Sequence, residues 1–294
     1  MCSLIFQPRI LSLNIHTQQE IKQLVVFDLD RTLLNKHSQL SPLTLQTLRE
    51  MDKQGIHYTI ATGRSFLSAE DIIKGHTFSL PQIYTNGVVT FCPAQQRFSF
   101  DNCLGLDETL AATEVMISNS AHPFINALND QGERIVFHGE YKNRFEQALL
   151  EQFELSPKTR MLPLSRLNHD FQITNISMIG PRDEVITAHN NIEALNHLIA
   201  YSGQAIEHEA YRWIDVHHAK ATKGTAIAKL KELLNIESII CFGDGDNDLS
   251  MFEIADECYA PENANIENKQ VATAVIGHHN EDGVAKFLTK RFSL

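Results

Sequence analysis

The feature that most constrains the fold is an apolar run, residues 24–27, that ends in two carboxylates, Asp28 and Asp30. Four consecutive apolar or β-branched residues predict a strand buried on both faces, as in the middle of a parallel sheet. Open α/β sheets bind their ligands at the carboxyl ends of such strands. Side chains two positions apart point to the same side of a strand, so we expect the two carboxylates to lie together if the strand continues through both.

Two neighbouring carboxylates need a partner, because adjacent anionic groups are destabilising unless a cation or a shared proton relieves them. The pair Asp28 and Asp30 therefore indicates a metal site or a role in proton transfer. Taken alone, an Asp-x-Asp pair is also typical of a solvated strand end. The remaining motifs of the chain distinguish these two interpretations.

Length, charge and cysteine use narrow the class of protein. The chain has 294 residues, 36 acidic and 25 basic, with a formal net charge of −11. That length favours two domains, and the acidic balance argues against a broad nucleic-acid surface. The five cysteines are odd in number and form no Cys-x-x-Cys pair, so we expect a reducing, cytoplasmic setting without disulfides or structural zinc. We predict neither a signal peptide nor a membrane span, since no apolar run approaches ~18 residues.

Alternating strands and helices predict a parallel sheet built from two separate parts of the chain, residues 21–87 and 217–294. We expect strands at residues 24–27, 56–61, 82–85, 238–242 and 271–276, and helices at 42–54, 66–74, 222–234, 249–255 and 282–290. Each part has too few strands for a stable sheet by itself. The two parts are therefore expected to form one sheet.

The middle of the chain, residues 88–216, does not continue this alternation and is expected to form an inserted α+β module. The predicted strands are 88–91, 98–100, 124–128, 134–137, 172–179, 204–209 and 213–216, and the predicted helices are 107–118, 143–153 and 181–199. Residues 1–20 form an N-terminal extension, whose role stays open.

A second acidic loop, residues 243–248, follows the predicted strand 238–242 and contains Asp244, Asp246 and Asp248. It lacks the third glycine of a dinucleotide-binding loop, and it lacks the glutamate that closes an EF-hand calcium loop. Mg2+ prefers a few carboxylates together with water and phosphate oxygens. The loop therefore indicates a site for a hard cation such as Mg2+.

Two other segments suit an anion. Thr62-Gly63-Arg64 lies between a predicted strand and a predicted helix, where hydroxyl and backbone N–H groups bind anions, although an ordinary helix cap is the alternative. Lys223 is expected at the start of a helix, where a cation is electrostatically unfavourable. A bound phosphate would explain it, whereas a plain surface lysine is the alternative and Lys220 is a competitor for the role.

The four motifs, taken in order, resemble those of haloacid dehalogenase-like (HAD) hydrolases. They are Asp28-Leu29-Asp30-Arg31-Thr32, Thr62-Gly63-Arg64, Lys223-Gly224 and the loop 243–248. The pair Asn86-Gly87, the insertion and the Gly-Asp-x-x-Asn-Asp loop resemble the Cof-type subgroup with a type II cap. The resemblance covers the chain from residue 24 onward. It implies an α/β fold with a Rossmann-like parallel-sheet core, residues 21–87 and 217–294, and an inserted α+β cap for substrate specificity, residues 88–216.

The resemblance also implies a role for each matching residue. Asp28 would attack phosphorus and form an aspartyl-phosphate, and Asp30 would serve as general acid and base. The other implied roles are phosphate binding by Thr62, Gly63, Arg64, Asn86 and Asn247, charge balance by Lys223, and Mg2+ binding by Asp28, the backbone carbonyl of Asp30, Asp244 and Asp248. Arg31 departs from the commonest pattern, which has glycine there, and either bends the loop or reaches the substrate.

The activity that this resemblance implies is a Mg2+-dependent phosphatase acting on a small phosphorylated metabolite. Family members that cleave carbon–halogen bonds lack an acid at the position of Asp30, so phosphate chemistry is favoured. Sugar phosphate, pyridoxal phosphate, flavin mononucleotide and nucleotide precursors all remain open as substrates. A sugar phosphomutase and a non-catalytic phospho-ligand sensor are the alternatives. The oligomeric state, monomer or dimer, also stays open.

Several conspicuous residues are not expected to be functional. The pairs His217-His218 and His278-His279 are adjacent in sequence, and adjacent side chains point in different directions, so neither pair predicts a metal site. Trp213 is expected to be a packing residue, with contact to a substrate ring as the alternative.

Overall fold

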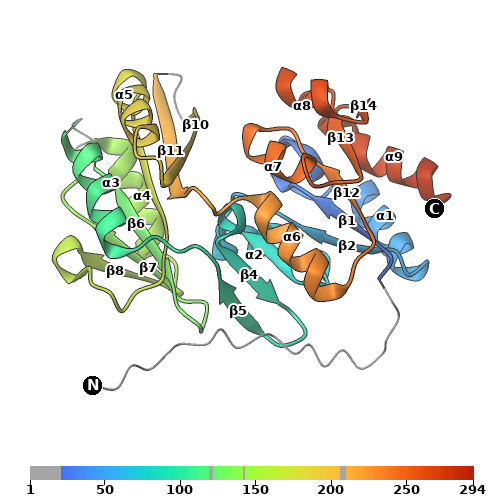
Figure 1. The fold of residues 1–294 in the computed structure, drawn as a ribbon, viewed down its shortest axis with the longest axis horizontal. Helices are drawn as coiled ribbons and strands as arrows, with labels where there is room; N and C mark the ends of the chain where they lie inside the picture. Colours follow the sequence, from blue (N-terminus) through green and yellow to red (C-terminus); the bar gives the residue numbers. More distant parts are fainter. Residues whose placement is uncertain (1–20, 119–121, 142, 206–209) are drawn as a thin grey trace.

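The computed structural model describes residues 21–118, 122–141, 143–205 and 210–294. The predicted extension, residues 1–20, and most of the predicted strand 204–209 lie outside these ranges. The described chain forms two lobes, a parallel-sheet core and a cap built on a second sheet, which are joined by two connections (Figure 1). Within the described ranges, no helix has both the length and the apolar character needed to cross a bilayer.

The core is a five-stranded parallel sheet that joins both ends of the chain, as predicted, but the predicted strand 82–85 lies outside it, in a small antiparallel sheet. Its order is β14 (Ala274–Ile276), β13 (Glu257–Pro261), β12 (Ser238–Phe242), β1 (Gln23–Phe27), β2 (His57–Ile60). The side chains of residues 24–27 on β1 are fully buried, because the strand is paired on both edges and covered on both faces. The apolar run therefore forms the strand that the sequence predicts.

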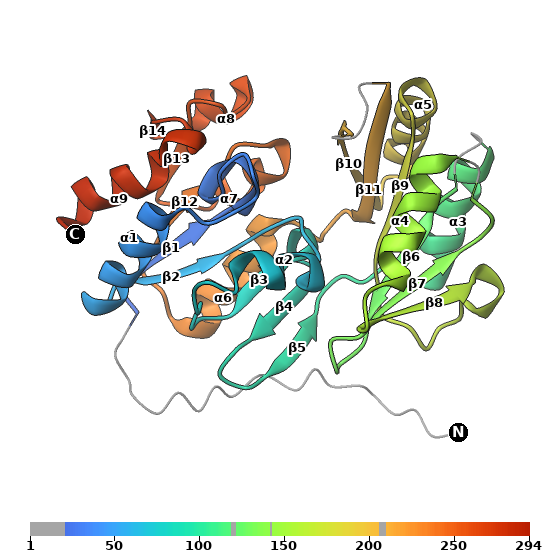
Figure 2. The ribbon, with the colours of Figure 1, turned by 180° about the vertical axis from the view of Figure 1, so that it is seen from behind.

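Helices cover both faces of this sheet (Figures 1 and 2). Val25 and Phe27 of β1 point to the face that is covered by α1 (Pro42–Lys53), α2 (Phe66–Ile73) and α9 (Gly283–Phe292). Leu24 and Val26 point to the other face, covered by α6 (Lys223–Leu234) and α7 (Leu249–Phe252). Alternate residues of one strand thus belong to two separate cores.

A small antiparallel sheet extends the core beyond β2. It consists of β3 (Gln82–Tyr84), β4 (Val89–Cys92) and β5 (Arg97–Phe100), and a parallel bridge between Ala61 and Ile83 links it to the end of β2. Apolar side chains of β4 and β5 pack in the same cluster as β1 and α2. We therefore propose that the cap begins near residue 101 rather than near residue 88.

The cap contains a six-stranded sheet with helices on both faces. The strand order is β10 (Leu198–Gln204), β11 (Tyr211–His218), β9 (Ile173–Pro181), β6 (Phe124–Leu128), β7 (Arg134–His138), β8 (Thr159–Pro163). Helices α3 (Leu106–Ser118) and α5 (Arg182–Glu193) pack on one face. Helix α4 (Arg144–Glu154) packs on the other face against Phe124 and Val136. The α/β core with an inserted α+β cap is thus the predicted fold class, which the structure confirms.

Some predicted elements were wrong. The helix predicted at 181–199 ends at Glu193, and β10 begins at Leu198, because Leu198 and Ala200 are buried at the period of a strand and not of a helix. The strand predicted at 271–276 begins only at Ala274, since helix α8 (Ile266–Val271) occupies its start. Strands β8 and β13 were not predicted, because each is five residues long and ends in proline.

Candidate active site

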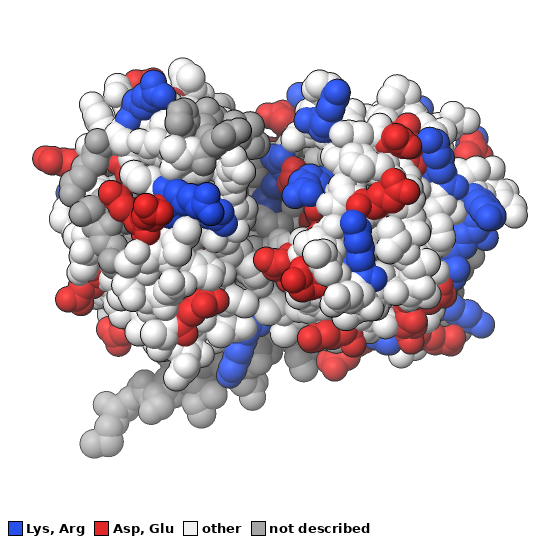
Figure 3. Space-filling model, turned by 90° about the horizontal axis from the view of Figure 1, so that it is seen from above, with Lys and Arg blue, Asp and Glu red and all other residues white. Residues whose placement is uncertain are grey.

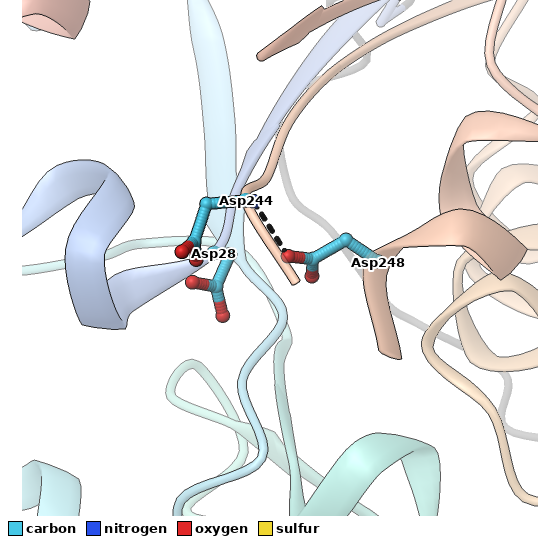
Figure 4. Close-up of side chains that lie close together, drawn as sticks. All are labelled: Asp28, Asp244 and Asp248. Atoms are coloured by element: carbon cyan, nitrogen blue, oxygen red, sulfur yellow. Dashed lines mark hydrogen bonds between the residues drawn. The ribbon is translucent and has the colours of Figure 1, made fainter. Parts of the chain in front are cut away.

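The acidic motifs meet because β1 and β12 are neighbours in the core sheet. Phe27 pairs with Phe242, and the backbone N–H of Asp28 donates to the Phe242 carbonyl at 2.9 Å. The loop after β12 therefore passes beside Asp28. One carboxylate oxygen from each of Asp28, Asp244 and Asp248 lies within 4.8 Å of the others, and all three residues are buried (Figure 4).

Lys223 enters this group from the start of α6. Its side chain is fully buried, and its Nζ lies 2.6 Å from Asp28 Oδ1 and 2.5 Å from Asp248 Oδ1. Thr222 caps the helix in a reciprocal capping box with Thr225, which fixes the first turn. The positive charge of Lys223, which is unfavourable at a helix start, is thus balanced by two carboxylates. Lys220, the other candidate for phosphate binding, is exposed.

Asp248 holds the acidic loop in shape. Its Oδ2 accepts from the backbone N–H groups of Asp244 at 2.8 Å and Gly245 at 2.9 Å, while Oδ1 accepts from Lys223. A Cβ at Gly243 would lie 2.6 Å from the Asp248 side chain, so only glycine allows the carboxylate to fold back so closely. With three bonds already accepted, Asp248 suits loop positioning better than metal ligation.

The buried charged groups shift one another's pKa values. Burial raises the pKa of Asp28 well above its usual value, an effect that Lys223 opposes and that Asp248 and Asp244 increase. Burial, together with Asp248, raises the pKa of Asp244 to about 7. Burial would lower the pKa of Lys223, but attraction to Asp248 and Asp28 outweighs it and the pKa is raised. Three carboxylates around one lysine leave an excess of negative charge, and oxygen donors of this kind fit a hard divalent cation.

Asp30 is placed differently from the sequence expectation. The strand ends at Phe27 and the chain enters a tight turn, Leu29–Leu33, so the two-residue period of a strand does not apply to Asp30. Its half-exposed carboxylate forms a bidentate ion pair with Arg64, with 2.6 Å to both Nε and Nη2. Arg64 Nη2 also donates to Ser38 at 3.2 Å. Arg64 thus holds Asp30, the residue expected to act as general acid and base. That Arg64 also contacts phosphate stays a prediction.

Arg31 occupies the position where the family pattern has glycine. Its φ is 58°, in the left-handed region, which glycine adopts without strain. Its Nε lies 3.4 Å from Asp244 Oδ2, and its Nη2 donates to the carbonyl of Asn263 at 3.0 Å. The departure therefore keeps the bend of the loop and adds contacts that hold a neighbouring loop.

The residues expected to bind phosphate come from three separate segments and lie together. Thr62 is buried, and its Oγ1 accepts from the backbone N–H of Arg64 at 3.1 Å, which leaves the hydroxyl hydrogen to donate. Asn247 Nδ2 donates to Asn86 Oδ1 at 2.9 Å. A Cβ at Gly63 would lie 3.1 Å from that same Asn86 oxygen and 3.4 Å from Asn247 Nδ2, so Gly63 admits both amides.

His217, which was not expected to be functional, is a neighbour of this group. It is fully buried at the end of β11, with Nε2 at 3.2 Å from Asn86 Nδ2 and 3.4 Å from Asp215 Oδ2. It thereby links the cap to the core. The contact joins residues 131 positions apart, and no local pattern marks it.

Comparison with known proteins agrees with this arrangement. The sequence profile of haloacid dehalogenase-like hydrolases matches residues 25–288. The chain is 26% identical over 280 residues to the 5-amino-6-(5-phospho-D-ribitylamino)uracil phosphatase YitU of Bacillus subtilis, covering 92% of this chain and 98% of the relative. It is 23% identical over 280 residues to the pyridoxal phosphate phosphatase YbhA of Escherichia coli, covering 90% and 97%.

The same fold occurs among solved structures. TM0651 from Thermotoga maritima superimposes with a TM-score of 0.72 at 22% identity, covering 92% of this chain and 97% of that protein. The match of the family profile extends over nearly the whole chain, from β1 to α9. The chain therefore belongs to the haloacid dehalogenase-like hydrolases, in the Cof-type subgroup that its motifs predict.

Proposed function

We propose that this protein is a Mg2+-dependent phosphatase that hydrolyses a small phosphorylated metabolite through an aspartyl-phosphate intermediate. The observation that carries the proposal is the position of Asp28, buried between Lys223 and Asp244 at the carboxyl end of β1. Lys223 contacts its Oδ1, and no described residue donates a hydrogen bond to its Oδ2. The phosphatase names of the two relatives support phosphate ester chemistry.

The chemistry requires a nucleophile and a proton carrier. An oxygen of Asp28 attacks phosphorus, the bond from phosphorus to the leaving oxygen breaks, and the carboxyl group of Asp30 gives that oxygen its proton. Asp30 then takes a proton from the water that hydrolyses the aspartyl-phosphate. Because Arg64 holds Asp30 through two hydrogen bonds, we propose that Arg64 orients this carboxyl group toward the leaving oxygen.

The other residues stabilise the charge of the phosphoryl group. The hydroxyl of Thr62 and the amide of Asn247 donate to its oxygens, and the ammonium of Lys223 offsets its negative charge. Asp28, Asp244 and the backbone carbonyl of Asp30 are the proposed ligands of Mg2+, with Asp248 holding the loop. Bound there, Mg2+ would supply the further positive charge that a phosphate beside three carboxylates requires.

The test is release of inorganic phosphate from phenyl phosphate and pyridoxal 5′-phosphate by the purified protein. We expect turnover with Mg2+, loss of turnover with EDTA and recovery when Mg2+ is returned in excess. Asp28→Asn should abolish turnover, whereas the matched substitution Asp71→Asn, at an exposed carboxylate on α2, should leave it unchanged. Full activity of Asp28→Asn would refute the assignment of the nucleophile.

The intermediate gives a second, independent readout. Protein quenched in acid during turnover should carry one added phosphoryl group on the peptide that contains Asp28. The label should be absent from Asp28→Asn. Turnover without any such label would contradict the covalent route.

A further inference from the structure

His217 lies at the junction between the cap and the core. Its side chain is fully buried near the end of β11 and packs against the ring of Tyr201 on β10, with 6.0 Å between the ring centroids. Figure 3 shows the molecule hollowed between the two lobes, and a cleft of about 340 Å³ is lined there by Gly63 from the core and Asp215 from the cap. His217 follows Asp215 by two residues on the same face of β11, so it is buried beside the cleft.

On the core side, Asn86 belongs to a tight turn that touches two motifs of the site. Thr85, Asn86 and Gly87 have φ values of 50°, 52° and 104°, all in the left-handed region. The backbone N–H of Asn86 donates to the Thr62 carbonyl at 3.1 Å, and a Cβ at Gly87 would lie 2.3 Å from the carbonyl oxygen of Thr222. The turn is therefore held between the Thr62 segment and the start of α6, which fixes the backbone of Asn86.

The buried side-chain amide of Asn86 joins the cap to the acidic loop. Its Oδ1 accepts from Asn247 Nδ2 at 2.9 Å, and its Nδ2 lies 3.2 Å from His217 Nε2. No other described residue accepts a hydrogen bond from Asn86 Nδ2. Without His217, a buried N–H group would lack an acceptor, which is destabilising, and the amide would be held at its oxygen alone.

The ring nitrogen Nε2 of His217 has two candidate partners, which exclude each other. An unprotonated Nε2 accepts from the Asn86 amide, whereas a protonated Nε2 donates to Asp215 Oδ2, which lies 3.4 Å away. Asn175 Nδ2 already donates to Asp215 Oδ1 at 2.6 Å. Asp215 therefore has a partner without His217, but the Asn86 amide does not. This difference favours the unprotonated Nε2 as acceptor.

This arrangement leaves the other ring nitrogen of His217 without a partner. The hydrogen of the neutral ring then lies on Nδ1, which is buried and has no hydrogen-bond partner among the described residues. A buried N–H without an acceptor is destabilising, and an apolar side chain would fill the same space without it. Such a loss of stability is typical of residues that serve a functional site.

We propose that His217 is a positioning residue, which orients the amide of Asn86 and, through it, the amide of Asn247 toward the phosphoryl group. The inference rests on the proposed phosphatase activity, in which Asn247 donates to phosphate, and adds a residue of the cap to that site. The histidine belongs to the cap, whereas both amides belong to the core. The two amides are therefore aligned only while this end of β11 rests on the core.

The test measures the affinity for inorganic phosphate by titration calorimetry in the presence of Mg2+, which requires no turnover. His217→Leu removes the acceptor, so we expect Kd to rise about 3- to 10-fold, as for loss of one hydrogen bond. His217→Gln carries a side-chain oxygen near the position of Nε2 and should bring Kd back to within about twofold of the wild type. The matched control His169→Leu, at an exposed histidine of the cap, should leave Kd unchanged. An unchanged Kd in His217→Leu, or an equal rise in His217→Gln, would overturn the inference.

A double variant distinguishes an effect through Asn86 from a general effect on the cap. Asn86→Gly removes the amide and suits a φ of 52°. Adding His217→Leu to Asn86→Gly should raise Kd by less than about twofold more. Multiplication of the two single effects would show that His217 acts elsewhere and would overturn the inference. Misfolding cannot imitate the expected result, because a smaller folded fraction lowers the number of binding sites and leaves Kd unchanged.

The tautomer of His217 in the wild-type protein decides the matter even if His217→Leu does not fold. The nitrogen NMR spectrum of protein with isotopically labelled histidine, with His217 assigned through its contact with the Tyr201 ring, should show Nδ1–H and an unprotonated Nε2 at neutral pH. A hydrogen on Nε2 would overturn the inference, because Nε2 would then donate to Asp215.

Hydrolysis of phenyl phosphate tests the proposed function separately. In His217→Leu, kcat/KM should fall by the same factor as the affinity for phosphate. Binding of phosphate by the wild type without turnover of any ester would refute the proposed phosphatase activity, and the comparison of Kd values would still decide the role of His217. Absence of phosphate binding by the wild type would overturn the inference itself.

Discussion

Replacing Lys223 by methionine tests whether the buried charge cluster is balanced as the structure indicates. Methionine keeps most of the apolar stem and removes the ammonium group, which contacts Asp28 and Asp248 at 2.6 and 2.5 Å. Lys223 is fully buried, and the two carboxylates are also buried. Removing one partner of a buried ion pair usually costs about 3 to 5 kcal/mol, because the remaining charge has no counter-charge.

We therefore expect the free energy of unfolding of Lys223→Met to fall by about 3 to 5 kcal/mol in EDTA, measured by urea denaturation. The control Lys220→Met removes an exposed lysine and should change it by less than about 0.5 kcal/mol. Excess Mg2+ should recover part of the loss, because it binds the folded state and supplies positive charge. A loss below about 1 kcal/mol, or no recovery with Mg2+, would refute this account of the cluster.

The loss should also depend on pH. The folded pKa of Asp28 lies above its unfolded value, so the folded state binds more protons and stability falls as pH rises from the unfolded pKa through the folded one. Lys223 opposes this rise in the pKa of Asp28. Removing Lys223 therefore raises the folded pKa of Asp28 further and widens the pH range over which stability falls. The destabilisation should therefore be smaller at about pH 5 than at about pH 8. A loss that is independent of pH would contradict the role of Asp28.

Three further predictions concern the loops around the site. Burial raises the pKa of Asp244 to about 7, so protons compete with Mg2+ for this carboxylate. The affinity for Mg2+ should therefore fall as pH drops through about 7, and the protons released on binding should be detectable by titration calorimetry in two buffers. Arg31→Ala should be less stable to urea than Arg31→Gly by about 1 kcal/mol, because both lose the same contacts and only alanine is strained at a φ of 58°; equal stability would contradict this. A Cβ at Gly224 would lie 2.0 Å from the carbonyl oxygen of Ser250, so Gly224→Ala should lower the unfolding free energy by about 1 to 3 kcal/mol. The control Gly75→Ala, where no atom lies closer than 3.8 Å to the added Cβ, should be nearly neutral.

The sequence by itself determined the parallel core and the meeting of its acidic motifs. A fully apolar run such as residues 24–27 is stable only where both faces of a strand are covered, and β1 is such a strand. Parallel strands bring their carboxyl ends to one edge, and the resemblance to HAD hydrolases implied that Asp28 and Asp244 lie near each other at one Mg2+ site. Local patterns also placed Lys223 at the start of a helix, as observed.

Local patterns did not determine the short strands and the boundaries within the cap. Strand β13 has five residues and contains glutamate and proline, and its pairing with β12, which lies 15 or more residues earlier in the chain, makes it a strand. The hairpin β4–β5 packs on the core because Phe91 and Phe98 meet Phe66 of α2. Such contacts override weak local propensity.

Only the tertiary structure decided how the side chains of the site are paired. The sequence predicted that Asp30 lies beside Asp28 if the strand continues through both, but the strand ends at Phe27 and the turn at Leu29–Leu33 directs Asp30 to Arg64. From the sequence, Lys223 was either a surface lysine or a residue that contacts phosphate. In the structure it is buried and pairs with the carboxylates of Asp28 and Asp248. His217 was noticed only as half of an adjacent histidine pair that was not expected to be functional. Motif spacing fixes where a residue lies along a strand or helix, whereas the partners of Lys223 and His217 come from chain segments more than a hundred residues away.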